Sequence, residues 1–259
     1  MSERTLLAID MGNTHMVIGV YQGEKLAYHW RLQTRHDGTV DEYGSTLRHL
    51  VEISGLNHQD IEGIAISSVV PPLTYVMEQM CRVYFHHRPI VVGPGIKTGI
   101  SILYDNPKEV GADRIVNAVA AIERYGGDLV VVDFGTATTF DCVSSDAEYM
   151  GGIICPGMMI SVEALFNRAS KLPRVELAKP KAVIGKTTVQ SMQSGIIYGY
   201  VGLVEGIVRR LKKEFKSTPK IIATGGLSKL IAKETDMVDV VDEYLTLDGL
   251  RILYEKNLK

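Results

Sequence analysis

The sequence lacks the features that identify several classes of protein. Its three cysteines, Cys81, Cys142 and Cys155, are widely spaced and form no C-x-x-C pair, so neither a disulfide framework nor a zinc site is predicted. The apolar stretch before Asp10 is too short for a signal peptide. The longest apolar run, 195–204, falls well below the roughly 20 residues that cross a bilayer. We therefore expect a soluble protein of the reducing cytoplasm that does not bind membranes.

An excess of charge of one sign is also absent. The formal net charge is −2, which gives the chain no overall attraction to nucleic acid or to an acidic membrane surface. Hydrophobic residues make up 46% and charged residues 22% of the chain, as is typical of a soluble globular protein. Because 259 residues exceed one average domain of about 100 to 200 residues, we expect two domains.

Both halves of the chain begin with three periodic segments that predict strands. Alternating apolar and β-branched residues place them at 6–10, 16–21 and 25–33, and again at 128–133, 139–144 and 148–154. Helices are predicted at 40–53, 71–85 and 115–125 in the first half, and from 158 and at 188–215, 228–234 and 247–257 in the second. Further strands are predicted at 64–70 and 89–92, and at 220–223 and 237–241. The two halves therefore share one order of elements.

A constant offset relates the two halves. Asp10 falls on Asp133, an offset of 133 − 10 = 123 residues, and the same offset places Gly12 on Gly135 and Val20 on Val143. Both copies read as an apolar strand, then Asp-x-Gly, then a small polar turn. This repetition predicts an α/β fold used twice, with lobes over residues 1–118 and 119–259.

The repeated Asp-x-Gly turn suggests a site for phosphate. It places a carboxylate at a strand tip and exposes backbone N–H groups where no β-carbon blocks a phosphate. One such turn can be ordinary turn chemistry, but two at matching places predict a phosphate clamp whose carboxylates hold cations. A third segment, Thr224-Gly225-Gly226, is either a common strand-to-helix connection or a flat surface for adenosine.

Two other nucleotide motifs are excluded by their spacing. Gly185-Lys186-Thr187 would need a glycine at Pro180 to form a P-loop. GPGIKTG at 93–99 lacks the G-x-G-x-x-G spacing and does not follow the first strand, as a dinucleotide fold requires. The Asp-x-Gly turns remain the candidates for a nucleotide site.

Five segments carry a resemblance to a known family. They are DMGNT at 10–14, GADR at 111–114, DFGTATT at 133–139, GGIICPG at 151–157 and TGG at 224–226. Together, and nearly end to end, they resemble type III pantothenate kinase of the acetate and sugar kinase, Hsp70 and actin superfamily. The resemblance implies two ribonuclease H-like (actin-like ATPase) lobes with a mixed sheet and a nucleotide cleft between them. It also implies phosphorylation of pantothenate by ATP at the start of coenzyme A biosynthesis, with Mg²⁺, a monovalent cation such as K⁺ or NH₄⁺, and a homodimer.

The same resemblance assigns roles to individual residues. Asp113 matches the general base, Asp133 the ligand of the monovalent cation, and Asp10 the partner of Mg²⁺. The implied ATP contacts are Asp10, Met11, Gly12, Asn13, Thr14, Thr136, Gly225 and Gly226. The implied pantothenate contacts are Tyr104, Gly111, Ala112, Asp113, Arg114 and Thr188. From the residues alone Asp113 can instead cap the helix that follows it, and at that place we expect it to keep a low pKa.

Other functions share the same fold. A regulatory relative that acts as a transcription accessory factor is one, although the retention of Asp113 argues against it. A nucleotide-driven switch like Hsp70 or actin carries large insertions for which 259 residues leave no room. A kinase for acetate, a sugar or glycerol is a third. Only the GADR and Thr188 segments favour pantothenate, so the acceptor rests on the resemblance.

Four glycines of the helix predicted over 188–215 lie on one face. Gly195, Gly199, Gly202 and Gly206 are spaced 4, 3 and 4 apart. Each glycine inside a helix costs about 0.5 to 1 kcal/mol relative to alanine. We therefore expect a second backbone to approach this face, either from another copy of the chain or from a neighbouring element of the same chain.

Overall fold

The computed structural model describes residues 4–258 and divides them into two compact units. Unit 1 runs to Ile100 and adds Asp105–Ala120 and the segment from Leu245 onward, whereas unit 2 comprises Ser101–Tyr104 and Ala121–Tyr244. This division differs from the sequence-based one at residue 118 because it groups the last helix with unit 1. Within residues 4–258, no helix is long and apolar enough to cross a membrane.

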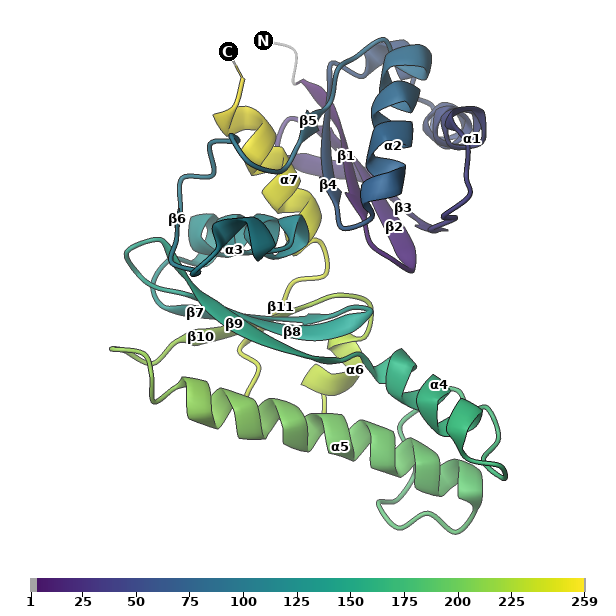
Figure 1. The fold of residues 1–259 in the computed structure, drawn as a ribbon, viewed down its shortest axis with the longest axis vertical. Coiled ribbons are helices and arrows are strands. Elements are labelled where there is room, and N and C mark those ends of the chain that lie inside the picture. Colours follow the sequence, from purple (N-terminus) through teal and green to yellow (C-terminus); the bar gives the residue numbers. More distant parts are fainter. Residues whose placement is uncertain (1–3, 259) are drawn as a thin grey trace. The chain divides into compact units, whose positions relative to one another are not determined.

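Unit 1 contains a mixed five-stranded sheet of order β3-β2-β1-β4-β5 (Figure 1). The first three strands, β1 (Thr5–Met11), β2 (His15–Gln22) and β3 (Lys25–Gln33), form the predicted antiparallel meander. The next two, β4 (Gly63–Ser68) and β5 (Ile90–Val91), are parallel to β1. The carboxyl ends of β1 and β4 therefore lie side by side, which places Asp10 opposite Ser67.

Helices cover both faces of this sheet. On one face α1 (Val40–Ile53) and α2 (Pro71–Tyr84) enclose the core, and on the other α7 (Leu245–Lys256) packs against β1, β2 and β4. A capping box starts α1, because Thr39 and Glu42 each accept a hydrogen bond from the backbone N–H of the other. The core consists of buried residues that include Leu7, Ile9, Met11, Ile18, Leu47, Ile64, Ile66 and Met77.

Unit 2 contains a mixed six-stranded sheet of order β11-β10-β7-β8-β9-β6. Its strands are β6 (Ser101–Ile102), β7 (Leu129–Phe134), β8 (Ala137–Val143), β9 (Glu148–Pro156), β10 (Lys220–Thr224) and β11 (Val240–Val241). The order 9-8-7-10-11 repeats the 3-2-1-4-5 order of unit 1, with the same strands antiparallel and parallel. The prediction of one α/β fold used twice is confirmed.

The helices of unit 2 are unequal in length. They are α4 (Met158–Arg168), α5 (Thr188–Leu211) and the short α6 (Ser228–Ala232), and α3 (Ala112–Tyr125) runs from unit 1 into unit 2. Apolar residues of α5, among them Ile197, Tyr200 and Val204, pack on the sheet residues Val132 and Phe140. The helix ends at Leu211, before the predicted Phe215, because i→i+3 bonds to Arg210 and Leu211 tighten the chain into a turn.

The two Asp-x-Gly hairpins differ by one residue. Met11 pairs with Met16 across the first, whereas Phe134 pairs with Thr138 across the second. The offset therefore falls from 123 to 122 after the turn, so that Val143 corresponds to Tyr21 rather than to Val20. The physical reason is that successive side chains of a strand point to opposite faces of the sheet. A turn longer by one residue would therefore move the apolar side chains of β8 away from the core face.

Candidate functional site

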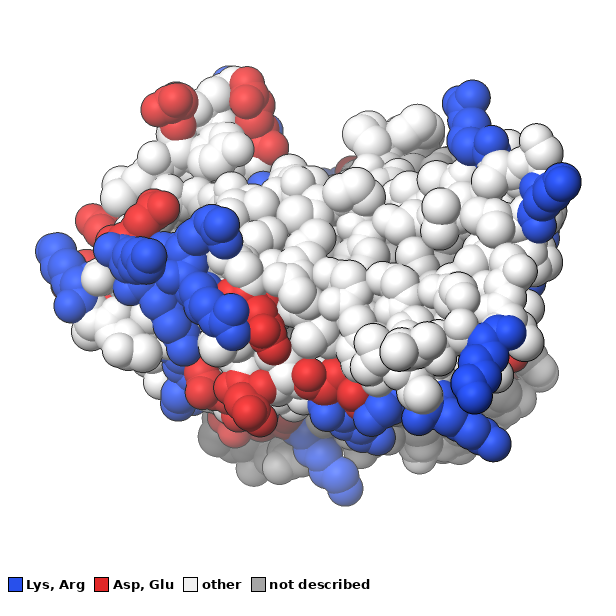
Figure 2. All heavy atoms as spheres, turned by 90° about the horizontal axis from the view of Figure 1, so that it is seen from below, with Lys and Arg blue, Asp and Glu red and all other residues white. Residues whose placement is uncertain are grey.

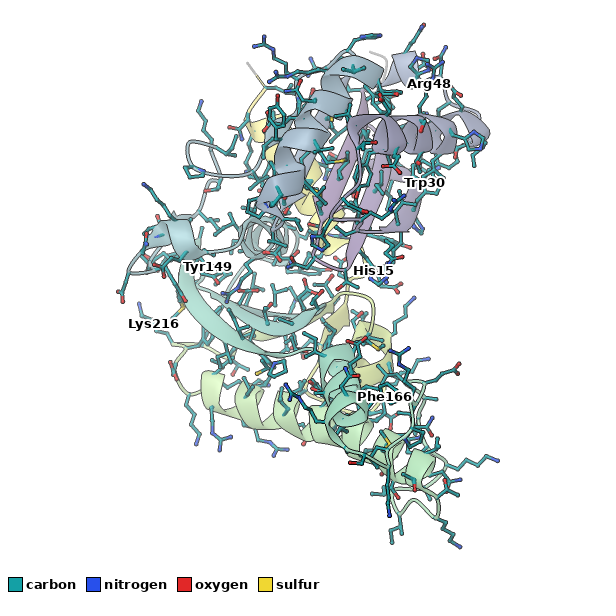
Figure 3. The ribbon with its side chains drawn as sticks, turned by 45° about the vertical axis from the view of Figure 1, so that its right-hand side comes forward. His15, Trp30, Arg48, Tyr149, Phe166 and Lys216 are labelled. Atoms are coloured by element: carbon teal, nitrogen blue, oxygen red, sulfur yellow. The ribbon has the colours of Figure 1, made fainter. Side chains whose placement is uncertain are left out.

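The first Asp-x-Gly turn lies at the tip of the β1–β2 hairpin, where His15 is labelled in Figure 3. Asp10 is half-buried near the end of β1, and Asn13 and Thr14 are exposed. The N–H of Gly12 donates to the carbonyl of His15 at 3.1 Å, which closes the turn. A β-carbon on Gly12 would lie 3.0 Å from the same carbonyl oxygen, so the turn favours glycine.

Two residues after β3 hold this turn, and the sequence analysis did not identify them. The Thr34 hydroxyl donates to the carbonyl of Gly12 at 2.7 Å, and the Thr34 N–H donates to the carbonyl of Thr14 at 3.0 Å. The ring of His36 contacts the carbonyl of Asn13 at 3.1 Å. A free carbonyl oxygen would repel a phosphate, and these contacts engage the carbonyl oxygens of the turn. The one signal in the sequence for this role of Thr34 and His36 is that they follow β3, the strand that pairs with β2.

Asp113 lies in the first turn of α3, which begins three residues before the predicted Ile115. Its Oδ1 accepts a hydrogen bond from the N–H of Arg114 at 2.8 Å. A β-carbon on Gly111 would meet that Oδ1 at 2.6 Å and Val69 at 3.7 Å. The N–H of Val69 in turn donates to the carbonyl of Met11 at 3.1 Å. The GADR segment thus lies beside the end of β1 that carries Asp10.

The pKa of Asp113 differs from the expectation. Burial raises the pKa of this carboxyl, and the N–H and guanidinium of Arg114 lower it by less. The prediction of a low pKa at a helix N-terminus is therefore wrong, because the loss of hydration outweighs the favourable contacts. A carboxylate with a raised pKa is a stronger base for a hydroxyl proton than an exposed aspartate.

The rest of the first turn of α3 is anchored in unit 1. Arg114 is buried, with 7% of its surface exposed, and Ala112 is half-buried. One turn further along, the buried Asn117 accepts a hydrogen bond from the Thr246 hydroxyl of α7 at 2.7 Å. This bond between α3 and α7 fixes the helix that presents Asp113. The sequence gives no sign of it, because the two residues are 129 positions apart.

In unit 2 the second Asp-x-Gly turn meets the glycine turn at 224–226. Asp133 on β7 is in register with Thr224 on the parallel strand β10. Gly225, at φ +87°, follows Thr224 and packs so closely that a β-carbon would overlap Oδ1 of Asp133. Thr136 is exposed at the tip of the β7–β8 hairpin, and Gly226 is exposed beside Gly225. The structure thus brings together Asp133 and Gly225, which the resemblance implies bind the cation and ATP.

The remaining predicted residues of unit 2 lie apart. Tyr104 follows β6, and its ring packs at 6.5 Å from that of Tyr149 on the first part of β9. Thr188 is the exposed first residue of α5. Figure 1 shows α5 beginning beyond α4, which follows the last residue of β9. Within unit 2 of a single chain, Tyr104 and Thr188 therefore do not lie in the same site.

Comparison with known proteins decides the family. A sequence profile of type III pantothenate kinase matches residues 6–210. A type III pantothenate kinase from Halalkalibacterium halodurans is 60% identical over 253 residues, which cover 98% of this chain and all of the relative. The chain belongs to the type III pantothenate kinase family.

Solved structures show the same fold at low identity. A conserved Baf family protein from Campylobacter jejuni, described as a transcriptional activator, superposes with a TM-score of 0.61 at 20% identity over 97% of this chain and 98% of its own. A polyphosphate/ATP-glucomannokinase from an Arthrobacter strain superposes with a TM-score of 0.51 at 13% identity over 98% and 100%. These superpositions show that this chain shares its overall fold with both proteins.

The described residues contain no group of three or more His, Cys, Asp or Glu side chains placed to hold a metal. A kinase does not require one, because Mg²⁺ typically uses one or two carboxylates together with water and substrate phosphates. Asp10 and Asp133 are half-buried carboxylates at the ends of strands. Each is thus able to serve as a single ligand to a cation that accompanies phosphate.

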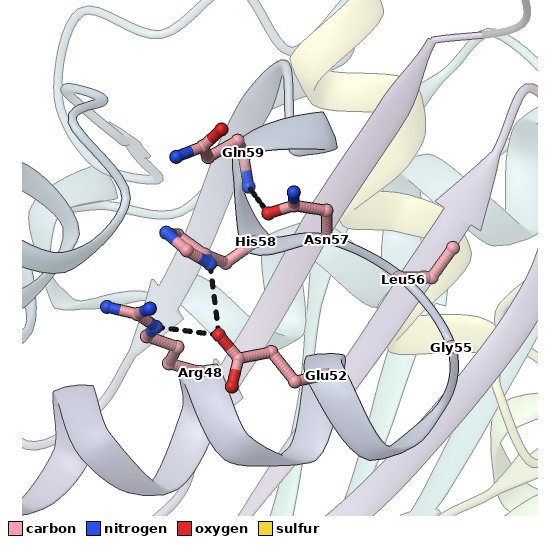
Figure 4. A pocket seen from close by; sticks show the side chains of 7 residues that line it. All are labelled: Arg48, Glu52, Gly55, Leu56, Asn57, His58 and Gln59. Atoms are coloured by element: carbon pink, nitrogen blue, oxygen red, sulfur yellow. Dashed lines mark hydrogen bonds and ion pairs between the residues drawn. The ribbon is translucent and has the colours of Figure 1, made fainter.

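A polar hollow of about 490 Å³ at the end of α1 is separate from these turns (Figure 4). Glu52 accepts from Arg48 at 2.7 Å and contacts His58 Nδ1 at 3.1 Å. The carboxylate therefore already bridges both basic groups. The lining residues are Arg48, Glu52, Gly55, Leu56, Asn57, His58 and Gln59. None of them is among the residues predicted to bind ATP, pantothenate or a cation.

Proposed function

We propose that this protein transfers the terminal phosphoryl group of ATP to the primary hydroxyl of pantothenate, which begins coenzyme A biosynthesis. Membership of the type III pantothenate kinase family carries this conclusion. The geometry supports it, because Asp113 is held beside the end of β1 by Gly111 and Val69. A kinase of the cytoplasm is consistent with the absence of a membrane-spanning helix among residues 4–258.

Asp113 would act on the acceptor hydroxyl. In a loose phosphoryl-transfer transition state the base mainly orients the attacking hydroxyl and accepts its proton late. The hydrogen bond from the N–H of Arg114 to Oδ1 fixes the carboxyl group, and its raised pKa strengthens it as a base. By the family resemblance, Gly111, Ala112, Arg114, Tyr104 and Thr188 would bind the rest of pantothenate.

The two Asp-x-Gly turns would bind ATP and its cations. Asp10 would hold Mg²⁺ and Asp133 the monovalent cation, and these cations offset the negative charge of the phosphates. The remaining ATP contacts would be Met11, Gly12, Asn13, Thr14, Thr136, Gly225 and Gly226. The N–H groups of Gly12 and Gly135 close their turns and so fix the conformation of the other turn residues, which supports this assignment.

A substrate panel tests the proposed function. ADP release is measured with ATP, Mg²⁺ and K⁺ against pantothenate, acetate, glycerol and glucose. We expect turnover with pantothenate alone. Equal or faster turnover with another acceptor would overturn the proposal, and ATP binding without turnover of any acceptor would favour a regulatory relative of the same fold.

We also propose that the protein is a homodimer joined along α5. From Thr188 to Val204 this helix contains no Asp, Glu, Lys or Arg. Figure 2 views the face over α5 and shows a broad area without charged side chains, with charged side chains on both sides of it and along its lower edge. Apart from the backbone of α5 itself, a β-carbon on Gly195, Gly199 or Gly202 would meet no described atom within 4 Å. Among residues 4–258, no neighbouring element therefore accounts for these three glycines, which supports a second copy as the backbone that approaches them.

A further inference from the structure

We propose that Tyr200 of α5 is a positioning residue that holds the Gly135–Thr136 turn in place for ATP, an inference that rests on the proposed function of that turn. No motif and no family resemblance in the sequence pointed to Tyr200. It belongs to the helix beneath the sheet, whereas the turn lies at the sheet edge. The two are linked through the corner between β9 and α4.

The first link is an unusually close contact between two backbones. Gly157 connects β9 to α4, and a β-carbon built on it would overlap the carbonyl oxygen of Thr136 and lie 2.8 Å from that of Gly135. The backbone at Gly157 therefore supports the turn from below, without an intervening side chain. Because nothing flexible separates them, a displacement of Gly157 must displace the turn as well.

The second link joins this corner to α5. The hydroxyl of Tyr200 donates to the carbonyl of Pro156, directly before Gly157, at 2.7 Å. The same hydroxyl lies 2.7 Å from Oγ of Ser161 in the first turn of α4. Tyr200 is 7% exposed, and its ring packs in the core of unit 2. One buried hydroxyl thus fixes both sides of the Gly157 corner to the longest helix.

The consequence for ATP follows from the position of the turn. Thr136 is exposed at its tip, and Gly135 closes it through an N–H bond to the carbonyl of Ala137 at 3.1 Å. Groups that bind a phosphate must be held within a fraction of an ångström to keep their hydrogen bonds. Tyr200 would therefore increase ATP affinity without touching ATP. Pantothenate, most of whose proposed contacts belong to the GADR segment of unit 1, should be affected far less.

Tyr200→Phe tests this inference, because it removes the hydroxyl and keeps the ring in the core. We expect ATP affinity, measured by calorimetry without pantothenate, to fall about tenfold, which is the effect of losing one well-placed hydrogen bond. In turnover assays the KM for ATP should rise by a similar factor, and the KM for pantothenate should change less than about twofold. ATP affinity within about twofold of wild type, together with a lower melting temperature, would overturn the inference and leave Tyr200 a purely structural role.

Tyr198→Phe is the matched control. Tyr198 lies two residues earlier on α5 and is also partly buried against the core, but its hydroxyl has no hydrogen-bond partner among residues 4–258. We expect wild-type ATP affinity for this variant. An equal loss of affinity in both variants would contradict a specific role for Tyr200. Calorimetry also separates the two proposals, because ATP binding without phosphorylation of pantothenate contradicts only the proposed function.

Ser161→Ala provides a second variant in case Tyr200→Phe does not fold. It removes one partner of the Tyr200 hydroxyl and retains the bond to Pro156. We expect ATP affinity to fall by about threefold, since half of the anchor remains. If Tyr200→Phe is unfolded, an unchanged ATP affinity in Ser161→Ala would overturn the proposal.

Discussion

Gly225 packs directly on the carboxylate of Asp133. A β-carbon at Gly225 would overlap Oδ1 of Asp133 and lie 2.8 Å from the backbone nitrogen and carbonyl carbon of Phe134. The glycine is also at φ +87°, a conformation that other residues rarely adopt. The backbone of the 224–226 turn therefore fixes where the carboxylate at the tip of β7 can lie.

We predict that Gly225→Ala weakens ATP binding by about tenfold or more. The added methyl group must push Asp133 aside, and it also imposes backbone strain of roughly 1 kcal/mol. Gly127→Ala separates the two effects, because Gly127 has φ +75° and no described atom within 4 Å of a β-carbon. The measurements are ATP affinity by calorimetry and a melting curve for both variants. Both should melt earlier, and only Gly225→Ala should lose affinity; equal affinities would show that the contact with Asp133 does not matter.

We predict that activity depends on a monovalent cation through Asp133. A carboxylate beside an anionic nucleotide adds repulsion unless a cation lies between them. Turnover should therefore differ between K⁺, Na⁺ and a bulky organic cation, and Asp133→Asn should lose that dependence. Steady-state rates in the three chloride salts at equal ionic strength test this. Equal rates in all three, or an unaltered cation response in Asp133→Asn, would contradict the role.

Local patterns sufficed to predict most of the fold. The helix at 40–53 and the strand at 25–33 coincide with α1 and β3 because a capping box and a clear alternation mark them. The two-residue strand β6 was missed, since it exists only through its pairing with Glu148 and Tyr149 at the start of β9. Short strands of this kind depend on a partner distant in sequence, which periodicity cannot reveal.

The candidate site was less predictable than the fold. The Asp-x-Gly turns and the GADR segment are local motifs, so their residues could be named from the sequence. The groups that hold them in place could not, because Thr34, Asn117, Gly157 and Tyr200 act through contacts with residues 20 to 129 positions away. The raised pKa of Asp113 was missed for the same reason, since burial depends on tertiary packing.

We predict that Gly202→Leu converts a dimer into a monomer. The position is exposed and open in one copy of the chain, so a leucine there fits the monomer and, as a better helix former, should not lower its melting temperature. It should block the close approach of a second helix. Sedimentation of wild type and variant checks this, with Gly93→Leu, at another open glycine, as control. A variant that remains dimeric, or a control that dissociates equally, would contradict an interface along α5.

The last prediction concerns Asp113, whose loss should damage turnover most while sparing ATP binding. Asp113→Asn keeps the shape and removes the charge, so turnover should fall by about 10²- to 10⁴-fold, the usual contribution of a general base. ATP affinity should stay within about twofold, because the Asp-x-Gly turns bind the nucleotide. In wild type, kcat/KM should fall on acidification with a midpoint above the ordinary aspartate value of about 3.9, since burial raises the pKa of this carboxyl.

The same raised pKa determines how the stability of wild type and Asp113→Asn should compare. When the folded pKa exceeds the unfolded one, folding favours the protonated carboxyl, so the group's stabilising contribution is complete below the unfolded pKa and is lost as pH rises through the folded pKa. At neutral pH the wild type contains a buried charge that asparagine lacks, and the variant should melt at the same temperature or higher. This advantage should shrink as the pH is lowered. Turnover within about threefold of wild type would end the assignment of Asp113 as base, and a collapsed melting temperature with weakened ATP binding would give it a structural role instead.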